Sequence, residues 1–466
     1  MAHERRAFVR CAPAAWASRS RTGPMYLLYT CVSLVAFAAL APYFAWQALR
    51  YRKYVTNLRQ RLGYLPVSFN LDGDESIWIH AVSVGEALAA RPLASALKAR
   101  YPGLRLFVST TTVAGQQVAA REIKEADATF YFPIDLGPIV RRTLRLVRPR
   151  LLVVMETEIW PILLRECRRQ GVQAVMANGR ISNRSYPRYR RIRPFIRRVL
   201  DHVDRFCMQS QESADRVVAL GADASRVRVT GNLKFDALPA APAGLERTGP
   251  RVLRYFRVPD GRPVIVAGST MRGEETAVLR AFGRLRAGGE RPLLVIAPRH
   301  PERFDEAERL AREEGFRVAR RSALEIDQEP PAEVVILDSI GELAHLYRIA
   351  TVVFVGGSLV PTGGHNILEP AVFGKPILFG PHMQNFREIA GTFLAAGAAA
   401  EVASGEALAE ALRDLLSDAK ARERLGQAAR AIIDANRGAC ERTLAAVAEV
   451  LPPRDGPKLR PFRLVR

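Results

Sequence analysis

The chain has 466 residues, a formal net charge of +22 and a pI near 10.5. Hydrophobic residues make up 48% and charged residues 25%, which is typical of a globular protein and excludes a disordered, collagen-like or multi-span membrane protein. Because domains usually run about 100 to 200 residues, the length predicts two large domains. The excess of positive charge predicts a polyanionic neighbour, such as nucleic acid, an anionic membrane or a phosphorylated substrate.

An uncharged apolar stretch, residues 25–49, lies near the N-terminus and is long enough to cross a bilayer as a helix. Arg50, Arg52 and Lys53 follow it at once, which is the pattern of a cytoplasmic flank. We therefore expect a membrane anchor rather than a cleaved signal peptide, with the bulk of the protein on the cytoplasmic side. Pro42 leaves open whether the anchor spans the bilayer or inserts in one leaflet.

Residues 1–24 form a basic extension before this anchor, so the natural start could be Met1 or Met25. Because neither sheet predicted below includes residues 1–50, we expect a chain without them to fold and to keep its ligand binding. Oligomeric state is not indicated by any sequence pattern.

Short apolar runs, each followed by a loop and a helical stretch, recur along the rest of the chain. This alternation predicts parallel, doubly wound sheets. The first series comprises residues 77–82, 105–110, 151–155, 172–176 and 205–208, and the second comprises residues 263–267, 292–297, 334–337, 351–355 and 376–379.

The two series are separated by a segment rich in Pro, Ala and Gly, residues 237–255, which is typical of a linker. We therefore predict two Rossmann-like domains facing each other across a cleft, residues 50–236 and 256–451, with a basic tail at 452–466. In such sheets ligands bind beyond the carboxyl ends of the strands, so the loops that follow the strands are the candidate functional sites.

Two loops of the first predicted domain carry carboxylates. Glu86 follows the first strand near a helix N-terminus, where an anion is stabilised, and it could equally be a helix cap. Glu156 and Glu158 follow the run at 151–155 and could bind metal, cap the next helix or act as acid and base. Lys234 lies at the end of the first domain, near the expected cleft.

An arginine-rich stretch follows the Asn178-Gly179-Arg180 sequence. Residues 184–198 contain seven arginines interleaved with Tyr186, Tyr189 and Phe195, more than a solvated helix face requires. We predict that this stretch binds phosphates or lipid headgroups, with a plain solvated surface as the alternative. The arginines assigned to acceptor and membrane are Arg184, Arg188, Arg190, Arg191 and Arg193.

The loops of the second predicted domain are suited to phosphate. Arg299 offers a bidentate fork and His300 a second donor. Two glycine-rich segments, 356–358 and 363–366, lead toward a helix, and such backbone is expected to cradle a phosphate.

The motifs HAVSVGE, METEIWP, NGRIS, GNLKFD, APRHPERF, DSIGEL and GGHNILEPAVFGKP occur in this order along the chain. With this set of motifs the sequence resembles bacterial 3-deoxy-D-manno-octulosonic acid (Kdo) transferases. The resemblance extends from Met25 to about Leu451. The resemblance implies a GT-B fold and transfer of Kdo from CMP-Kdo to the lipid A precursor lipid IVA, without metal or other cofactor, at the inner membrane.

The resemblance also assigns roles to residues. It implies that Glu86 is the catalytic base and that Glu156 and Lys234 stabilise the transition state. It implies that CMP contacts fall on the second-domain loops: Arg299, His300, Ile340, Gly341, Glu342, Asn366, Ile367, Leu368 and Glu369.

This chemistry is physically consistent with the residues. A sugar hydroxyl is a poor nucleophile and needs a carboxylate to take its proton, while the leaving CMP needs cations such as Lys234 and Arg299. Direct displacement with one base implies inversion at the anomeric carbon, by analogy with glycosidases. The number of Kdo residues added is not predicted by any motif.

Two other functions and one possible metal-binding motif are alternatives to this prediction. The first is a GT-B enzyme that uses a UDP-sugar, since such enzymes share the Glu-Pro-x-x-x-Gly-x-Pro pattern. The second is a membrane-tethered nucleic-acid-binding protein. Only the alternation of Tyr and Arg favours it, so we expect no nucleic acid partner. The Asp-x-Asp at Asp72 and Asp74 precedes the first strand and is predicted to be a turn rather than a metal site.

Overall fold

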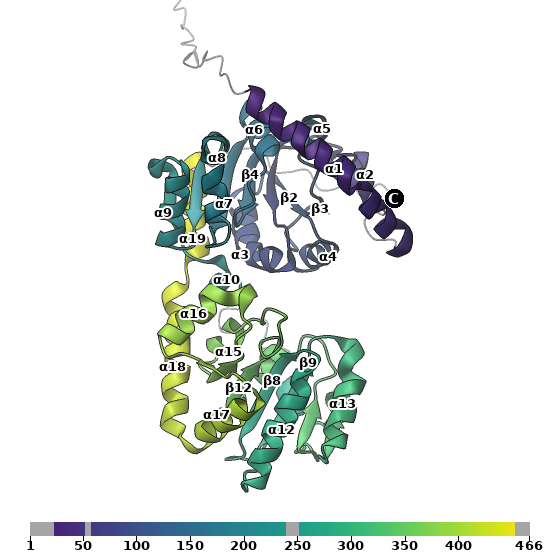
Figure 1. The fold of residues 1–466 in the computed structure, drawn as a ribbon, viewed down its shortest axis with the longest axis vertical. Helices are drawn as coiled ribbons and strands as arrows, with labels where there is room; N and C mark the ends of the chain where they lie inside the picture. The colour runs from purple at the N-terminus through teal and green to yellow at the C-terminus, as the bar shows by residue number, and fades with distance from the viewer. Residues whose placement is uncertain (1–22, 52–56, 239–250, 453–466) are drawn as a thin grey trace, which may run out of the picture.

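The computed structural model describes residues 23–51, 57–238 and 251–452, and the proposed extension and basic tail lie outside them except at Gly23, Pro24 and Pro452. Figure 1 shows two domains, one above the other, with a long helix along the upper one. That helix is α1 (Gly23–Tyr51), and the upper domain is the first in sequence.

The first domain is built on a parallel sheet of seven strands in the order β3-β2-β1-β4-β5-β6-β7. The strands are β1 (Ser76–His80), β2 (Arg105–Thr110), β3 (Ala128–Tyr131), β4 (Pro149–Met155), β5 (Gln173–Gly179), β6 (Arg205–Met208) and β7 (Val227–Val229). The helices are α2 (Leu58–Arg61), α3 (Val84–Arg100), α4 (Val113–Glu122), α5 (Gly137–Val147), α6 (Pro161–Arg169), α7 (Tyr186–Arg191), α8 (Arg193–Leu200), α9 (Gln211–Leu220) and α10 (Leu233–Asp236).

The second domain repeats this plan, with a parallel sheet in the order β10-β11-β9-β8-β12-β13-β14. Its strands are β8 (Val264–Thr270), β9 (Leu293–Pro298), β10 (Val318–Arg320), β11 (Val334–Ile336), β12 (Val352–Val355), β13 (Ile377–Phe379) and β14 (Ala400–Glu401). Its helices are α12 (Glu274–Ala287), α13 (Phe304–Glu313), α14 (Leu343–Leu346), α15 (Leu368–Val372), α16 (Arg387–Ala395), α17 (Gly405–Ser417) and α18 (Ala419–Asn436).

Every predicted apolar run is a strand, because residues buried on both faces of a parallel sheet read as continuous hydrophobic sequence. The central strands β1, β2 and β9 are buried at every position. Four edge or near-edge strands, β3, β7, β10 and β14, were not predicted. They have two to four residues and are partly exposed, so they carry little hydrophobic signal.

The expected end of the second domain at residue 451 differs from the structure. Helix α19 (Ala439–Val450) returns to the first domain, where Ala446 and Val447 join the core beneath α3. Figure 1 shows it in the first domain, beyond the end of α18. Asp236 accepts hydrogen bonds from the backbone amides of Gly438 and Cys440 at 2.8 and 2.6 Å, which caps this returning helix. Tyr101 also donates to the carbonyl of Leu451 at 2.6 Å.

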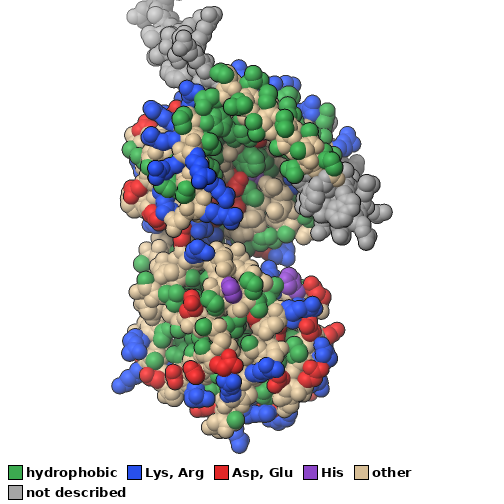
Figure 2. Space-filling view, viewed as in Figure 1, with side chains coloured by type: hydrophobic (Ala, Val, Ile, Leu, Met, Phe, Trp, Pro, Cys, Tyr) green, Lys and Arg blue, Asp and Glu red, His purple; other side chains and the backbone are tan. Residues whose placement is uncertain are grey.

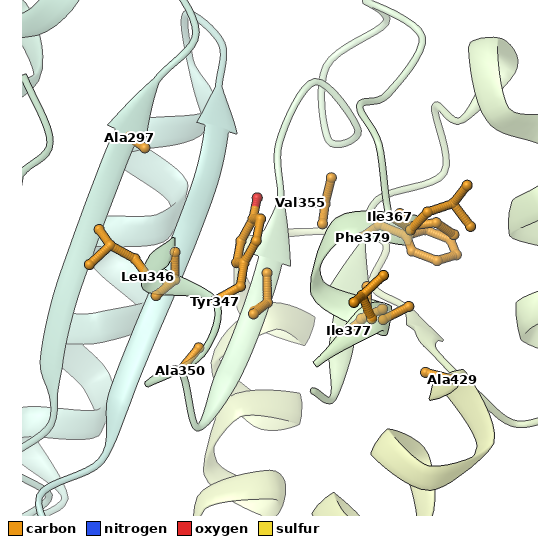
Figure 3. Packing of buried hydrophobic residues seen from close by; sticks show 14 of the residues in the cluster. Ala297, Leu346, Tyr347, Ala350, Val355, Ile367, Ile377, Phe379 and Ala429 are labelled. Carbon is orange, nitrogen blue, oxygen red and sulfur yellow. The ribbon is translucent and has the colours of Figure 1, made fainter. Parts of the chain in front are cut away.

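The core of the second domain lies beneath the loops at the ends of its strands. Figure 3 shows Ile367 and Phe379 packed close together, with Tyr347 standing against the neighbouring strands. Ile367 and Phe379 are both fully buried. Val252 and Phe256 belong to the same core, so the second domain begins slightly before the predicted residue 256.

Helix α1 packs against the first domain, although neither sheet includes any part of it, as predicted. Tyr26 is 2% exposed, packs edge-on against Phe195 and bonds to Nε2 of His202 at 2.8 Å. Beyond this contact the helix exposes a row of large apolar side chains, including Leu28, Val35 and Phe37. Among the described residues, 23–42 of this helix form the one segment long and apolar enough to cross a membrane. Its first turns therefore pack on the first domain, and the folding of a chain without residues 1–50 stays a prediction.

Candidate active site

Glu86 lies in the first turn of α3, beside the carboxyl end of β1. Its carboxylate accepts hydrogen bonds from the backbone N–H of Val82 at 2.8 Å and from Oγ of Ser83, the N-cap residue, at 3.1 Å. The residue is 8% exposed. Val82 precedes the helix, so Glu86 does not cap an amide of α3, and the two bonds hold its carboxylate in a fixed orientation.

The protonation of Glu86 is unusual for a glutamate. Burial, followed by the negative charge of Glu156 and then by that of Glu158, raises its pKa to about 8. Burial and Glu156 also raise the pKa of Glu158. The three carboxyl groups are therefore close enough to affect one another's ionisation, and a carboxyl with a pKa near neutral pH is suited to general-base catalysis.

Glu156 forms an ion pair with Lys234 in which Oε1 and Nζ are 3.3 Å apart, with both side chains about one fifth exposed. Glu156 has a left-handed backbone, with φ of 54°, which costs a non-glycine residue energy. Its N–H donates to the carbonyl of Ala177 at 2.9 Å, which helps to hold it there. Lys234 also lies 5.9 Å from the ring centroid of Phe386 in the second domain, so this pair stands at the domain junction.

Asn178 is a positioning residue that sequence reasoning did not single out. It is fully buried with φ of 57°, and its Oδ1 accepts the N–H of Leu233 at 2.9 Å, the residue that begins α10 and precedes Lys234. The nearby Arg180 bonds to Glu388 of the second domain at 2.7 Å. The signal was an Asn-Gly pair at a strand end, since Asn tolerates left-handed backbone and still offers a side-chain acceptor.

The arginine-rich stretch forms α7 and α8 at the rim of this site. Arg184, Arg188, Arg190, Arg191 and Arg193 are all exposed, and within residues 23–51, 57–238 and 251–452 none of them has an ion pair. Burial and the charge of Glu158 raise the pKa of Tyr189, so α7 lies beside the carboxylate loop. Figure 2 shows a recess in the first domain with acidic side chains in it and basic side chains along one side.

In the second domain, Arg299 and His300 are exposed in the loop after β9. Burial, followed by the neighbouring positive charges of Arg299 and His300, lowers the pKa of His365 to about 4. A Cβ at Gly357 would lie 2.9 Å from Nε2 of His365, so glycine is needed where this ring packs. The positive charges of Arg299 and His300 therefore lie close enough to His365 to disfavour its protonated form.

The polar side chains at the start of helix α15 form hydrogen bonds with one another and with the backbone. Asn366 donates to Glu369 at 3.1 Å and accepts the N–H of Leu368, also at 3.1 Å. Burial raises the pKa of Glu369. The side chains of Ile367 and Leu368 are buried in the core, so any contact of these two with a nucleotide would be made by main-chain atoms.

The loop after β11 lies next to that of β9 in the sheet order. Ile340 is 80% exposed there, and Gly341 has φ of 90°. Glu342 forms an ion pair with Arg321 at 2.9 Å and accepts from Oγ of Ser339 at 2.7 Å, so its carboxylate is already held within the protein.

One predicted phosphate cradle is wrong. The backbone amides of Gly357, Ser358 and Leu359 donate to the carboxylate of Glu274 at 2.6, 2.9 and 2.8 Å. Glu274 is fully buried and also accepts the N–H of Met271. The loop at 356–358 therefore binds an anion that belongs to the chain itself, and its role is to fix the loop that carries His365.

The Asp72-Gly73-Asp74 segment is a turn, as predicted. The N–H of Gly73 donates to the carbonyl of Asn70 at 3.1 Å, and Asp74 pairs with Arg105 at 3.0 Å. In the part of the chain that the structure describes, no group of three or more His, Cys, Asp or Glu side chains is arranged to hold a metal ion.

Comparison with known proteins agrees with this geometry. Residues 56–237 match the family described as 3-deoxy-D-manno-octulosonic-acid transferase (kdotransferase), and residues 276–432 match glycosyl transferases group 1. The solved structure of UDP-GlcNAc 2-epimerase from Neisseria meningitidis, bound to UDP-GlcNAc, covers 80% of this chain and 100% of its own, with a TM-score of 0.56 at 13% identity. That likeness shows a shared fold, which is the predicted GT-B arrangement.

Two curated relatives are called 3-deoxy-D-manno-octulosonic acid transferase. The protein from Haemophilus influenzae is 34% identical over 422 residues, which are 89% of this chain and 96% of the relative. The protein from Bordetella pertussis is 36% identical over 388 residues, 80% of this chain and 87% of the relative. The chain therefore belongs to the 3-deoxy-D-manno-octulosonic acid transferase family of glycosyltransferases.

Proposed function

We propose that this Kdo transferase moves Kdo from CMP-Kdo to lipid IVA at the cytoplasmic face of the bacterial inner membrane. The observation that carries the proposal is the placement of a buried carboxyl with a raised pKa, Glu86, near the Glu156–Lys234 pair at the domain junction. The cationic loops of the second domain provide the nucleotide side.

In this mechanism Glu86 takes the proton of the acceptor hydroxyl as that oxygen attacks the anomeric carbon of Kdo. The bond to the CMP phosphate breaks on the opposite side, which inverts the anomeric configuration. The backbone N–H of Val82 and the hydroxyl of Ser83 hold Glu86 in a single orientation, so the carboxylate does not have to reorganise when the proton moves.

Negative charge develops on the CMP phosphate as it leaves, and Lys234 and Arg299 are assigned to stabilise it. Glu156 holds Lys234 at the junction through their 3.3 Å ion pair. The proposal therefore gives the neutralisation of phosphate to side chains and backbone amides, and it predicts transfer without a divalent metal. Addition of EDTA should leave the rate unchanged, and a loss restored by magnesium would contradict this part.

The acceptor assignment rests on charge and hydrophobicity. A bisphosphorylated, acylated disaccharide requires cations beside an apolar surface, and residues 184–193 offer five exposed arginines in the same domain as the apolar face of α1. Each basic residue close to an anionic surface contributes about 1 kcal/mol. Membrane attachment through α1 would bring the recess of the first domain to the acceptor.

The deciding experiment incubates the purified protein with CMP-Kdo and lipid IVA and analyses the lipid product by mass spectrometry. We expect lipid IVA with added Kdo, and the mass also gives the number of residues transferred. A thermal-shift comparison of CMP with UDP forms the second arm, in which CMP should stabilise the protein more. Absence of a Kdo-containing lipid, or stabilisation by UDP alone, would contradict the proposal.

A further inference from the structure

Asp135, in the segment after β3, has a buried carboxylate that accepts three hydrogen bonds. It is 6% exposed and accepts the N–H of Leu163 at 2.7 Å, the N–H of Ile162 at 3.0 Å and the hydroxyl of Tyr29 at 3.0 Å. Within the described ranges it has no ion pair with Lys, Arg or His. A buried carboxylate without a cation depends on such donors, so each of the three bonds matters to it.

Two of these donors belong to the first turn of α6, which begins at Pro161. The first amides of a helix lack partners within the helix, and no side-chain cap bond is made by Trp160, the N-cap residue. Asp135 supplies the acceptor from another part of the chain. It therefore fixes the point where the loop of residues 156–160, which carries Glu156 and Glu158, joins its helix.

The segment that contains Asp135 also packs against the strand that leads to Glu86. Phe132, three residues before Asp135, lies between Trp160, at 4.7 Å between ring centroids, and His80, at 3.8 Å. His80 ends β1, two residues before Val82, whose N–H donates to Glu86. One packed unit thus connects Asp135 with both carboxylate loops.

The third donor comes from the apolar N-terminal helix. Tyr29 lies in α1, stacks on Phe195 with centroids 5.9 Å apart and directs its hydroxyl to Asp135. Tyr26, three residues earlier in the same helix, hydrogen-bonds to His202 instead and does not touch this unit by a hydrogen bond. The two tyrosines therefore differ in what their hydroxyls hold.

We infer that Tyr29 and Asp135 are positioning residues for the transfer reaction, through which helix α1 holds the loop of residues 156–160 in its working position. This inference rests on the proposed function and adds a second role to the helix. The segment that attaches the enzyme to the membrane also completes the hydrogen bonding beneath its active site, so displacement of α1 would loosen the carboxylate cluster.

The test compares Tyr29→Phe with Tyr26→Phe in the full chain, reconstituted in vesicles of phosphatidylethanolamine and phosphatidylglycerol. Each change removes one hydroxyl and keeps the ring. We expect Tyr29→Phe to lower kcat roughly ten-fold, the effect of a lost hydrogen bond to a charged group. The KM for CMP-Kdo and the binding to vesicles should stay at the parental values, and Tyr26→Phe should keep kcat within about two-fold.

Asp135→Asn gives a second line of evidence. It should lower kcat more than Tyr29→Phe, and adding Tyr29→Phe to it should cause little further loss, because the hydroxyl has already lost its charged acceptor. Equal kcat for Tyr29→Phe and the parent, or equal losses in both tyrosine variants, would overturn the inference.

Hydrogen exchange provides a readout that does not depend on activity. The amides of Ile162 and Leu163 should exchange faster in Tyr29→Phe than in the parent and in Tyr26→Phe, and unchanged exchange would also overturn the inference. If the parent itself makes no Kdo-containing lipid, the proposed function fails, whereas the exchange result still decides whether α1 holds the loop.

Discussion

The two domains share a fold but differ in the charge at the facing ends of their sheets. The first domain brings Glu86, Glu156 and Glu158 near one another, and burial and mutual repulsion raise the pKa of Glu86 to about 8. The second gathers Arg299, His300 and His365, where burial and positive neighbours lower the pKa of His365 to about 4. The first domain is thus suited to accept a proton and the second to hold an anion. These are the opposite surroundings that the acceptor and the donor of a sugar transfer require.

The largest expected effect comes from removing the proton acceptor. Glu86→Gln should lower kcat by about 10² to 10⁴, the usual contribution of a general base, while CMP affinity stays unchanged because the nucleotide side lies in the other domain. Steady-state kinetics and CMP titration calorimetry measure the two quantities. Glu166→Gln is the matched control, since Glu166 is also a buried first-domain glutamate and pairs with Arg141 and Arg169. Near-parental turnover of Glu86→Gln would show that the role is misassigned.

A substitution of Lys234 tests the role of the cation at the junction of the two domains. Lys234→Met should lower kcat by about 10² to 10³, the usual loss when a charge-stabilising group is removed. Single-turnover assays with CMP-Kdo measure this step directly. Lys98→Met removes a lysine that pairs with Asp127 at 2.7 Å in the same domain and should leave the rate unchanged. If both variants lose the same activity, the effect is one of general stability.

A smaller effect is expected at the rim of the recess. Changing Arg188, Arg190, Arg191 and Arg193 to Ser should raise the KM for lipid acceptor about ten-fold or more and weaken salt-sensitive vesicle binding, with the donor KM unchanged. A control that changes four exposed second-domain arginines, Arg272, Arg280, Arg284 and Arg286, removes the same charge elsewhere. Unaltered acceptor use would mean that the arginine-rich stretch is only a solvated surface.

Much of this arrangement could be predicted from sequence because buried parallel strands and strand-end loops leave local signals. The strand runs, the GT-B arrangement and the loops with Glu86, Glu156, Lys234 and Arg299 were all found in this way. The role of each of these residues remains a prediction. The short edge strand β14, with two residues, has no comparable signal.

The remaining features depend on contacts between distant parts of the chain. The Glu274 carboxylate accepts hydrogen bonds from the backbone amides of residues 357–359, which lie more than 80 positions further along the chain. A glycine-rich segment whose sequence predicts a phosphate site is therefore occupied by a side chain of the protein itself. The return of α19 to the first domain and the bond from Tyr29 to Asp135 are likewise tertiary. An apolar stretch read alone indicates a membrane anchor and says nothing of the tyrosines that join it to the core.

The pH dependence of single-turnover transfer tests the central claim most directly. Because Glu86 must be ionised to accept a proton, the rate should rise with pH and level off above a pKa of about 8, and this rise should be absent in Glu86→Gln. In Glu156→Gln the rise should move to lower pH, because one of the negative charges that raise the pKa is gone. A rise centred at the ordinary glutamate pKa, or one that persists in Glu86→Gln, would contradict the account.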